Sequence, residues 1–172
     1  MTSVILDDIY ISDVTASEEV YLVVEETALP EQVQDVSASQ EIREGTKRFE
    51  QFAKDANIIT ISVYDAHTQE KLEAEPTYTI ENVTSHYDML TSWKKWKQQT
   101  ELVRIEKSQI ECGYYDERMM TVSSKGCHVV SRMGEDITCF CNHTTSFSVL
   151  LSVQYYEIPQ WIEVSKLLNV NF

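Results

Sequence analysis

Positive charge is scarce in this sequence. The 172 residues include 14 lysines and arginines against 28 aspartates and glutamates, which gives a formal net charge of -14. Proteins that bind nucleic acids gather basic side chains into a stripe that neutralises phosphates. Nothing in the sequence resembles such a stripe, so we exclude nucleic acid as a partner and expect a solvated, acidic surface.

Long apolar segments are missing as well. No uninterrupted apolar run reaches the roughly 18 to 20 residues that a membrane-spanning helix needs. Residues 1–8 contain no basic region followed by an apolar run, and therefore do not resemble a signal peptide. The sequence thus offers neither a secretion signal nor a membrane anchor of its own.

Cysteines are few but concentrated, because all four lie between positions 112 and 141. An even number in so short a stretch favours two disulfides formed in an oxidising compartment. A disulfide-bonded module without signal or anchor is expected to be a piece of a longer protein. We expect residues 156–172 to be a linker towards a membrane segment outside the chain.

Zinc is the alternative use for these cysteines, since His128 follows Cys127 and His143 follows Cys139 and Cys141. A Cys-x-Cys pair, however, places both sulfurs on one face of a strand. It lacks the turn of two to four residues that structural zinc sites use. We therefore favour disulfides, and expect neither a metal nor another cofactor.

The hydrophobic pattern predicts a mainly β protein with one core, folded as an antiparallel β-sandwich with one or two short helices. Residues 30–40 are polar and predict a loop, and the spacing of Ile42, Phe49 and Phe52 predicts a helix over residues 40–54. Trp93 and Trp96 favour a core-capping turn or short helix over an aromatic and basic contact surface. The expected strands cover residues 3–12, 18–25, 58–64, 77–83, 101–106, 108–115, 127–132, 136–141 and 146–154.

Residues 139–151 carry the strongest chemical signal, because they bring a histidine close to hydroxyl groups just before a strand. His143 can remove the hydroxyl proton of Thr145, whose oxygen can then attack the carbonyl of Thr144. This arrangement suggests self-cleavage between Thr144 and Thr145. In the strand that follows, Phe147, Val149 and Leu151 share one face, and Ser146, Ser148 and Leu150 share the other. His67, His86 and His128 have no comparable context and are expected to be structural or exposed.

The stretch from residue 112 to residue 152 resembles the proteolysis-site (GPS) motif that ends the GAIN domain of adhesion G-protein-coupled receptors. The resemblance rests on all four cysteines, a Gly-Cys step, a His-x-Thr triplet and a Phe-x-Val-Leu segment, within residues 112–116, 125–131 and 139–151. It implies disulfides Cys112–Cys139 and Cys127–Cys141. Residues 1–111 would form the upstream part of the GAIN-like sandwich, and residues 112–155 would complete the same domain.

By this resemblance, His143 is the general base, Thr145 the nucleophile and Thr144 the donor of the scissile carbonyl, in a single turnover and not as an enzyme acting on other molecules. The family implies a domain on the extracellular face of the plasma membrane, with its own C-terminal strand, a downstream transmembrane bundle and an extracellular protein ligand as partners. The released strand would act as a tethered agonist through Thr145, Phe147, Val149, Leu150 and Leu151.

The sequence departs from the family at three positions. Tyr115 and Val122 occupy places where tryptophan is usual, and Thr144 replaces the common leucine. Thr144 also creates a glycosylation sequon at Asn142, in addition to the one at Asn82. Two alternatives stay open: the same module in a polycystin-like multi-pass protein, which a transmembrane count would distinguish, and an adhesion or structural module that folds without cleaving.

Overall fold

In the computed structural model, the described residues are 3–13, 19–34, 36–53 and 56–159. They form two antiparallel sheets, with 62% of the described residues in strands and 11% in helices. The fold is therefore mainly β and consistent with the β-sandwich that the sequence predicts. No helix in the described ranges has the length and apolar character needed to cross a membrane.

The smaller sheet has the strand order β1-β7-β11-β10. Its bounds are Ser3–Ile11 for β1, Ala74–Glu81 for β7, Asp136–Cys141 for β11 and Cys127–Met133 for β10. The larger sheet has the order β2-β5-β12-β4-β3, and β8 also pairs with β12. Its bounds are Val20–Thr27 for β2, Ile58–Asp65 for β5, Ser146–Ile158 for β12, Thr46–Phe52 for β4, Ser37–Arg43 for β3 and Leu102–Asp116 for β8. Two short strands extend it: β6 (Lys71–Leu72) beside β5, and β9 (Thr121–Ser123) beside β8.

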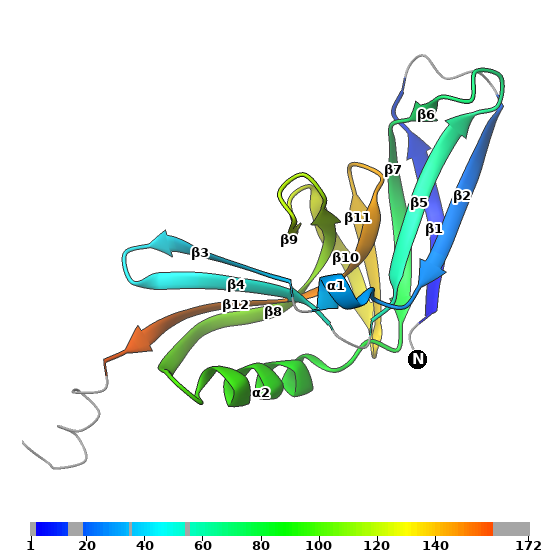
Figure 1. The fold of residues 1–172 in the computed structure, drawn as a ribbon. Helices are drawn as coiled ribbons and strands as arrows, with labels where there is room; N and C mark the ends of the chain where they lie inside the picture. Colours follow the sequence, from blue (N-terminus) through cyan, green and yellow to red (C-terminus); the bar gives the residue numbers. More distant parts are fainter. Residues whose placement is uncertain (1–2, 14–18, 35, 54–55, 160–172) are drawn as a thin grey trace, which may run out of the picture.

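Strand β12 has neighbours along both of its edges. On one edge it pairs with β8 from Phe147 to Ile158. On the other edge it pairs first with β5, through Ser146 and Phe147, and then with β4, from Leu150 to Tyr156. Figure 1 shows β12 leaving the two-layered part of the molecule and running out along an arm that it shares with β3, β4 and β8.

The main core lies between the two sheets. Tyr78 and Ile80 of β7 pack there with Ile59 and Ile61 of β5, and with Phe147 of β12. The Tyr78 and Phe147 rings stack with their centroids 5.1 Å apart. Each of these five side chains is at most 1% exposed, so the first residues of β12 belong to the centre of the sandwich.

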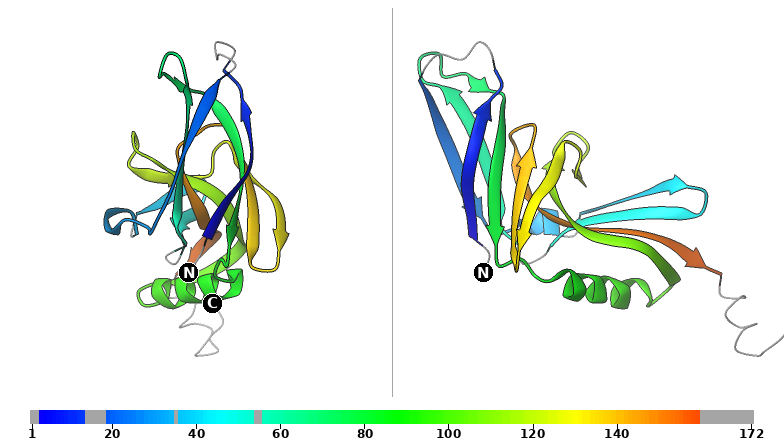
Figure 2. Two further views of the ribbon diagram at one scale, coloured as in Figure 1. Left: turned by 90° about the vertical axis from the view of Figure 1, so that its right-hand side faces the viewer. Right: turned by 180° about the vertical axis from the view of Figure 1, so that it is seen from behind.

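Helix α2 (His86–Lys97) covers one face of the arm, as both views in Figure 2 show. The Ser85 hydroxyl accepts a hydrogen bond from the Asp88 backbone N–H at 3.1 Å and so caps the first turn. Trp93 is buried against Phe49 and Tyr155, as the core-capping interpretation predicts, whereas Trp96 is 57% exposed. The other helix among the described residues, α1, is a single turn at Glu31–Gln34, inside the segment expected to be a loop.

The helix expected over residues 40–54 is wrong. Strands β3 and β4 form a hairpin there, with Gly45 at a φ of +77° in the turn. The spacing of Phe49 and Phe52 fits a helix, but both side chains are buried on a strand that pairs with β12. Pairing with a central strand has outweighed the local periodicity.

Two other boundaries also differ from the sequence-based expectation. The strands expected at 101–106 and 108–115 are one continuous strand, β8, with a register shift next to Ile105. Strand β12 continues to Ile158 and so enters the range expected to be a linker. The rest of that range, residues 160–172, lies outside the described residues.

Candidate functional site

The candidate residues His143, Thr144 and Thr145 occupy one short turn, residues 142–145, between the end of β11 and the start of β12. All three side chains are partly buried, whereas Asn142 is exposed. The turn connects the two sheets, because β11 belongs to the smaller sheet and β12 to the larger one. The scissile bond that the sequence suggests therefore lies where the chain crosses from one layer to the other.

Backbone hydrogen bonds hold both ends of this turn. The Asn142 N–H donates to the Gly126 carbonyl at 2.9 Å, and the Ile61 N–H donates to the Thr145 carbonyl at 3.1 Å. The hydroxyls of Ser146 and Thr60 lie 2.8 Å apart, within hydrogen-bond distance, just beyond the turn. The candidate nucleophile is thus anchored to β5 through its own backbone.

Both disulfides that the resemblance implies are present. Cys127–Cys141 joins the paired strands β10 and β11 immediately before the turn. Cys112–Cys139 joins β8 to β11, and so links the larger sheet to the smaller one. Among the described residues, no group of three or more metal-ligating side chains comes together. The cysteines serve here as covalent braces around the turn.

The imidazole of His143 packs over a cross-strand aromatic pair. Tyr114 on β8 lies directly opposite Phe147 on β12. The His143 ring makes an edge-to-face contact with Tyr114, with centroids 4.3 Å apart, and a tilted contact with Phe147 at 5.6 Å. Its Nε2 atom lies 4.0 Å from the Sγ atom of Cys127. Three strands and a disulfide therefore fix the position of this ring.

The surroundings of His143 favour its neutral form. Burial lowers the pKa of the imidazole below its ordinary value of 6.5, because desolvation penalises the charged ring. A hydrogen bond with the Lys125 backbone and the negative charge of Asp116 act in the opposite direction, but the net shift of the pKa is downward. A neutral imidazole is the form that can accept a proton at physiological pH.

Strand β12 is buried on both faces directly after the turn. Phe147 and Val149 lie in the core between the sheets, Leu150 packs with Phe52 and Val122, and Leu151 packs in the arm beside Trp93. Ser148 lies on the face opposite Phe147 but is also fully buried, and its hydroxyl donates to the Asn57 carbonyl at 2.9 Å. The residues of the expected agonist segment that follow Thr145 are therefore hidden inside the folded domain.

The packing against β12 leaves little free space. A Cβ atom on Gly113 of β8 would lie 2.3 Å from Cδ1 of Leu150 and 2.9 Å from the carbonyl oxygen of Ser123. Tyr115 and Val122, which stand where the family has tryptophans, pair across β8 and β9 and pack in the same cluster as Leu150. These two side chains thus add to the apolar cover over the strand.

The other candidate residues lie in separate places. Asn82 is exposed after the end of β7, with a φ of +56°. His67 lies on the turn after β5, His86 begins α2, and the ring of His128 contacts that of Phe140 at 5.1 Å. Sequence reasoning missed Tyr114 and Phe147 as neighbours of His143. This contact depends on the register between β8 and β12, which the residues between them do not specify.

Fold and site together define a disulfide-braced β-sandwich that presents a His-Thr-Thr turn just before a buried strand. The family model "GPS: GAIN subdomain B" matches residues 18–155. The chain belongs to this family. The match extends far upstream of the cysteine-rich stretch that carries the resemblance in the sequence, and takes in strands from both sheets.

The human adhesion G-protein coupled receptor F1 is a relative of this chain. It is 40% identical over 59 residues, which make up 32% of this chain and 6% of the receptor. The chain thus corresponds to a small part of that relative's length. No solved structure matches the chain.

Proposed function

We propose that this domain cuts its own backbone between Thr144 and Thr145 and retains the new C-terminal fragment through β12. The main support for this proposal is the environment of His143, which lies two residues before the candidate nucleophile Thr145. Its ring is held by Tyr114 and Phe147, and its lowered pKa favours the form that accepts a proton. Holding a base and a nucleophile on one short turn removes most of the entropic cost of bringing them together.

The reaction is an N-to-O acyl shift followed by hydrolysis. His143 takes the hydroxyl proton of Thr145, and the oxygen bonds to the carbonyl carbon of Thr144. The tetrahedral intermediate then breaks the C–N bond, and the amide nitrogen of Thr145 receives the proton from the imidazolium. Water hydrolyses the resulting ester, which leaves a carboxylate on Thr144 and a free amine and hydroxyl on Thr145.

After the cut, non-covalent contacts would hold the two fragments together. Strand β12 pairs with β8 along one edge and with β5 and β4 along the other, and Phe147, Val149 and Leu150 are completely buried. Residues 145–151 would then be a hidden agonist for a transmembrane bundle downstream. In this proposal the domain is extracellular, within a multi-pass cell-surface receptor of the adhesion G-protein-coupled type. The human relative, an adhesion G-protein coupled receptor, supports that setting.

Intact mass of the secreted, deglycosylated chain tests the cleavage, and a denaturing gel gives the same answer as one band or two. The unmodified chain is expected to give two fragments whose masses sum to that of the chain plus one water. Thr145→Ala is expected to give one uncut chain, and Thr145→Ser is expected to cleave because it keeps the oxygen. His143→Ala is expected to slow cleavage by about 100- to 10,000-fold, the usual value of general-base assistance.

A matched control is Ser146→Ala, which removes a neighbouring hydroxyl that has no role in the reaction. It is expected to cleave like the unmodified chain. An uncut, folded chain in both the unmodified form and Thr144→Leu would rule out self-cleavage. An uncut chain that becomes cleavable through Thr144→Leu would assign the block to Thr144 or to the sequon that this residue creates.

A second candidate function is a non-cleaving adhesion or structural module. The observation that favours it is the sequon at the exposed Asn142, directly beside His143. A glycan attached there would stand over the turn and obstruct the movements that the acyl shift needs. The mass of the secreted chain before and after deglycosylation distinguishes the two functions, because the obstructed form carries the glycan and remains in one piece.

A further inference from the structure

Strand β2 ends the larger sheet and differs from the other long edge strands of the described chain. The register of β1, β3, β8 and β10 shifts at one point in each strand: next to Asp8, next to Arg43, next to Ile105 and next to Ser131. Such irregularities discourage another strand from pairing with a sheet edge. By contrast, β2 keeps an unbroken register with β5 through eight consecutive pairs, from Val20 to Thr27.

The side chains of β2 are also of the kind found on strands that are paired on both edges. The central residues are apolar and between 37% and 45% exposed: Val20, Tyr21, Leu22, Val23 and Val24. They include none of the lysines or prolines that commonly protect an edge. Leu22 and Val24 lie opposite Val63 and Ile61, which are completely buried. Leu22 and Val24 therefore extend the apolar face of the sheet to its edge, where they are partly exposed to solvent.

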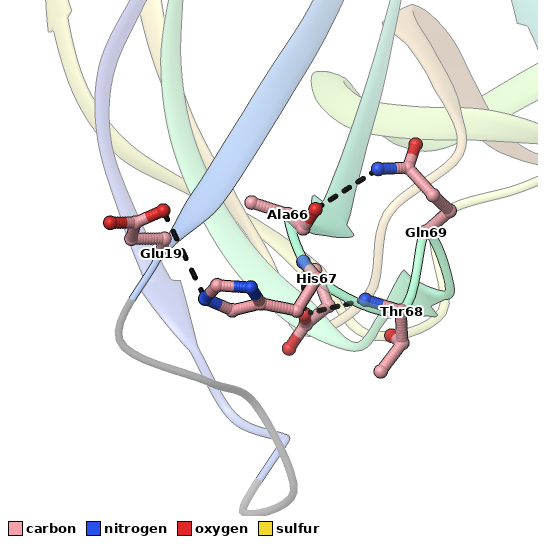
Figure 3. Close-up of polar contacts among 6 residues, drawn as sticks. Glu19, Ala66, His67, Thr68 and Gln69 are labelled. Atoms are coloured by element: carbon pink, nitrogen blue, oxygen red, sulfur yellow. Dashed lines mark hydrogen bonds and ion pairs between the residues drawn. The ribbon is translucent and has the colours of Figure 1, made fainter.

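Acidic residues stand at both ends of this apolar segment. Glu19 precedes the segment, and its Oε2 atom lies 3.9 Å from Nε2 of His67. His67 is on the turn that follows β5, as Figure 3 shows. Glu25 and Glu26 follow it. In an antiparallel pairing of β2 with a second copy, centred on Leu22, Glu19 would face Glu25. Like charges opposite each other destabilise a strand pair, so a second copy in this register is a poor occupant of this edge.

We propose that β2 is a docking edge for an extended segment of another protein, one with alternating apolar residues and with lysine or arginine at its ends. The segment would add an antiparallel strand to the larger sheet and take its affinity from backbone hydrogen bonds. Its apolar side chains would pack beside Leu22 and Val24, and its basic ends would meet Glu19 and Glu25. The same charges select against acidic segments and against self-association.

Hydrogen exchange on the full 172-residue chain, with and without the peptide acetyl-KKVTVTVKK-amide, tests the proposal. Backbone amides of β2 are expected to become protected, while those of β1 are unchanged. The affinity is measured from the fluorescence anisotropy of the labelled peptide. Two comparison peptides use the same chain: acetyl-EEVTVTVEE-amide, which reverses the charges, and acetyl-KKVTPTVKK-amide, whose proline interrupts strand pairing.

The charge-reversed peptide is expected to bind about tenfold more weakly at low salt, with a smaller difference as salt rises. The proline peptide is expected not to protect β2. Leu22→Lys is expected to lower the affinity for the basic peptide about fivefold, the value of a good cross-strand pair. Ile5→Lys is its matched control, because Ile5 is 49% exposed on the bulged edge strand β1.

Three results would overturn the proposal: protection that appears outside β2, equal affinities for the three peptides, or equal losses from the two lysine variants. Pairing of the chain with itself through β2 in the absence of peptide would overturn it in favour of a second copy. The peptide comparison uses the unmodified chain, so the proposal stays testable if a variant fails to fold.

Discussion

Strands β2 and β12 lie in the same sheet and are both rich in valine, leucine and tyrosine, yet their surroundings are opposite. Every residue of β2 is exposed, whereas the seven residues from Phe147 to Val153 in β12 are all buried. β12 has partners on both edges, and further layers cover both of its faces. The position of a strand in the sheet, more than its composition, thus decides whether its side chains are buried.

The largest expected effect concerns the aromatic side chain at the start of β12. Phe147→Ala is expected to lower the free energy of unfolding by about 3 to 5 kcal/mol, because it leaves a cavity beside Tyr78 in a close-packed core. Val23→Ala in β2 is expected to cost less than about 1 kcal/mol, since that side chain keeps contact with water. Urea unfolding in a Thr145→Ala background measures both, and equal losses would remove the contrast between the strands.

The disulfides come next in size, because they brace the region around β12 and neither involves a residue of β2. Replacing Cys112 and Cys139 together by alanine is expected to cost about 2 to 4 kcal/mol. The pair Cys127 and Cys141 is expected to cost less, since it closes a loop of 14 residues and not 27. Thermal unfolding measures which double variant loses more stability. In both variants, hydrogen exchange should rise in β12 before it rises in β2. A larger loss from replacing Cys127 and Cys141 would show that local geometry outweighs loop length.

A smaller effect separates two serines on the same face of β12. Ser148→Ala is expected to cost about 0.5 to 1.5 kcal/mol, because it removes the hydrogen bond that the buried Ser148 donates to the Asn57 carbonyl. Ser146→Ala is expected to be close to neutral, since its hydroxyl is partly exposed and water can replace the contact with Thr60. Urea unfolding of the two variants tests the difference. A neutral Ser148→Ala would indicate that the face opposite Phe147 is wetter than the structure shows.

The smallest effect is the pH response of His143. Its pKa is lower in the folded protein than in the unfolded chain, so the folded state holds fewer protons between those two values. This contribution to stability is fully present above the unfolded pKa of about 6.5 and is lost as the pH falls through the lower, folded pKa. An NMR titration of the imidazole should give a midpoint below 6.5, and the cleavage rate should fall over the same range. A midpoint at or above 6.5 would contradict the burial of the ring.

The sequence allowed the sandwich class and most strands to be predicted, because alternation in segments such as residues 58–64 reflects one buried face. It failed at residues 40–54, where the spacing of Phe49 and Phe52 suits a helix and only pairing with β12 selects a strand. At the site, the identities of His143 and Thr145 were visible in the motif. The aromatic support from Tyr114 was not, because it depends on a register between strands that are far apart in the chain.

The pairing of β12 has a mechanical consequence. Figure 1 shows β1 at the sandwich side of the molecule and the C-terminal end of β12 at the far end of the arm. A force that pulls β1 and the C-terminal end of β12 apart would act nearly along the axis of β12. It would therefore act at right angles to the hydrogen bonds of β12 with β8 and β4. Those bonds would bear the load together in shear instead of opening one at a time. A pull across the arm would unzip the same strand at a much lower force, so the direction of tension would govern its release.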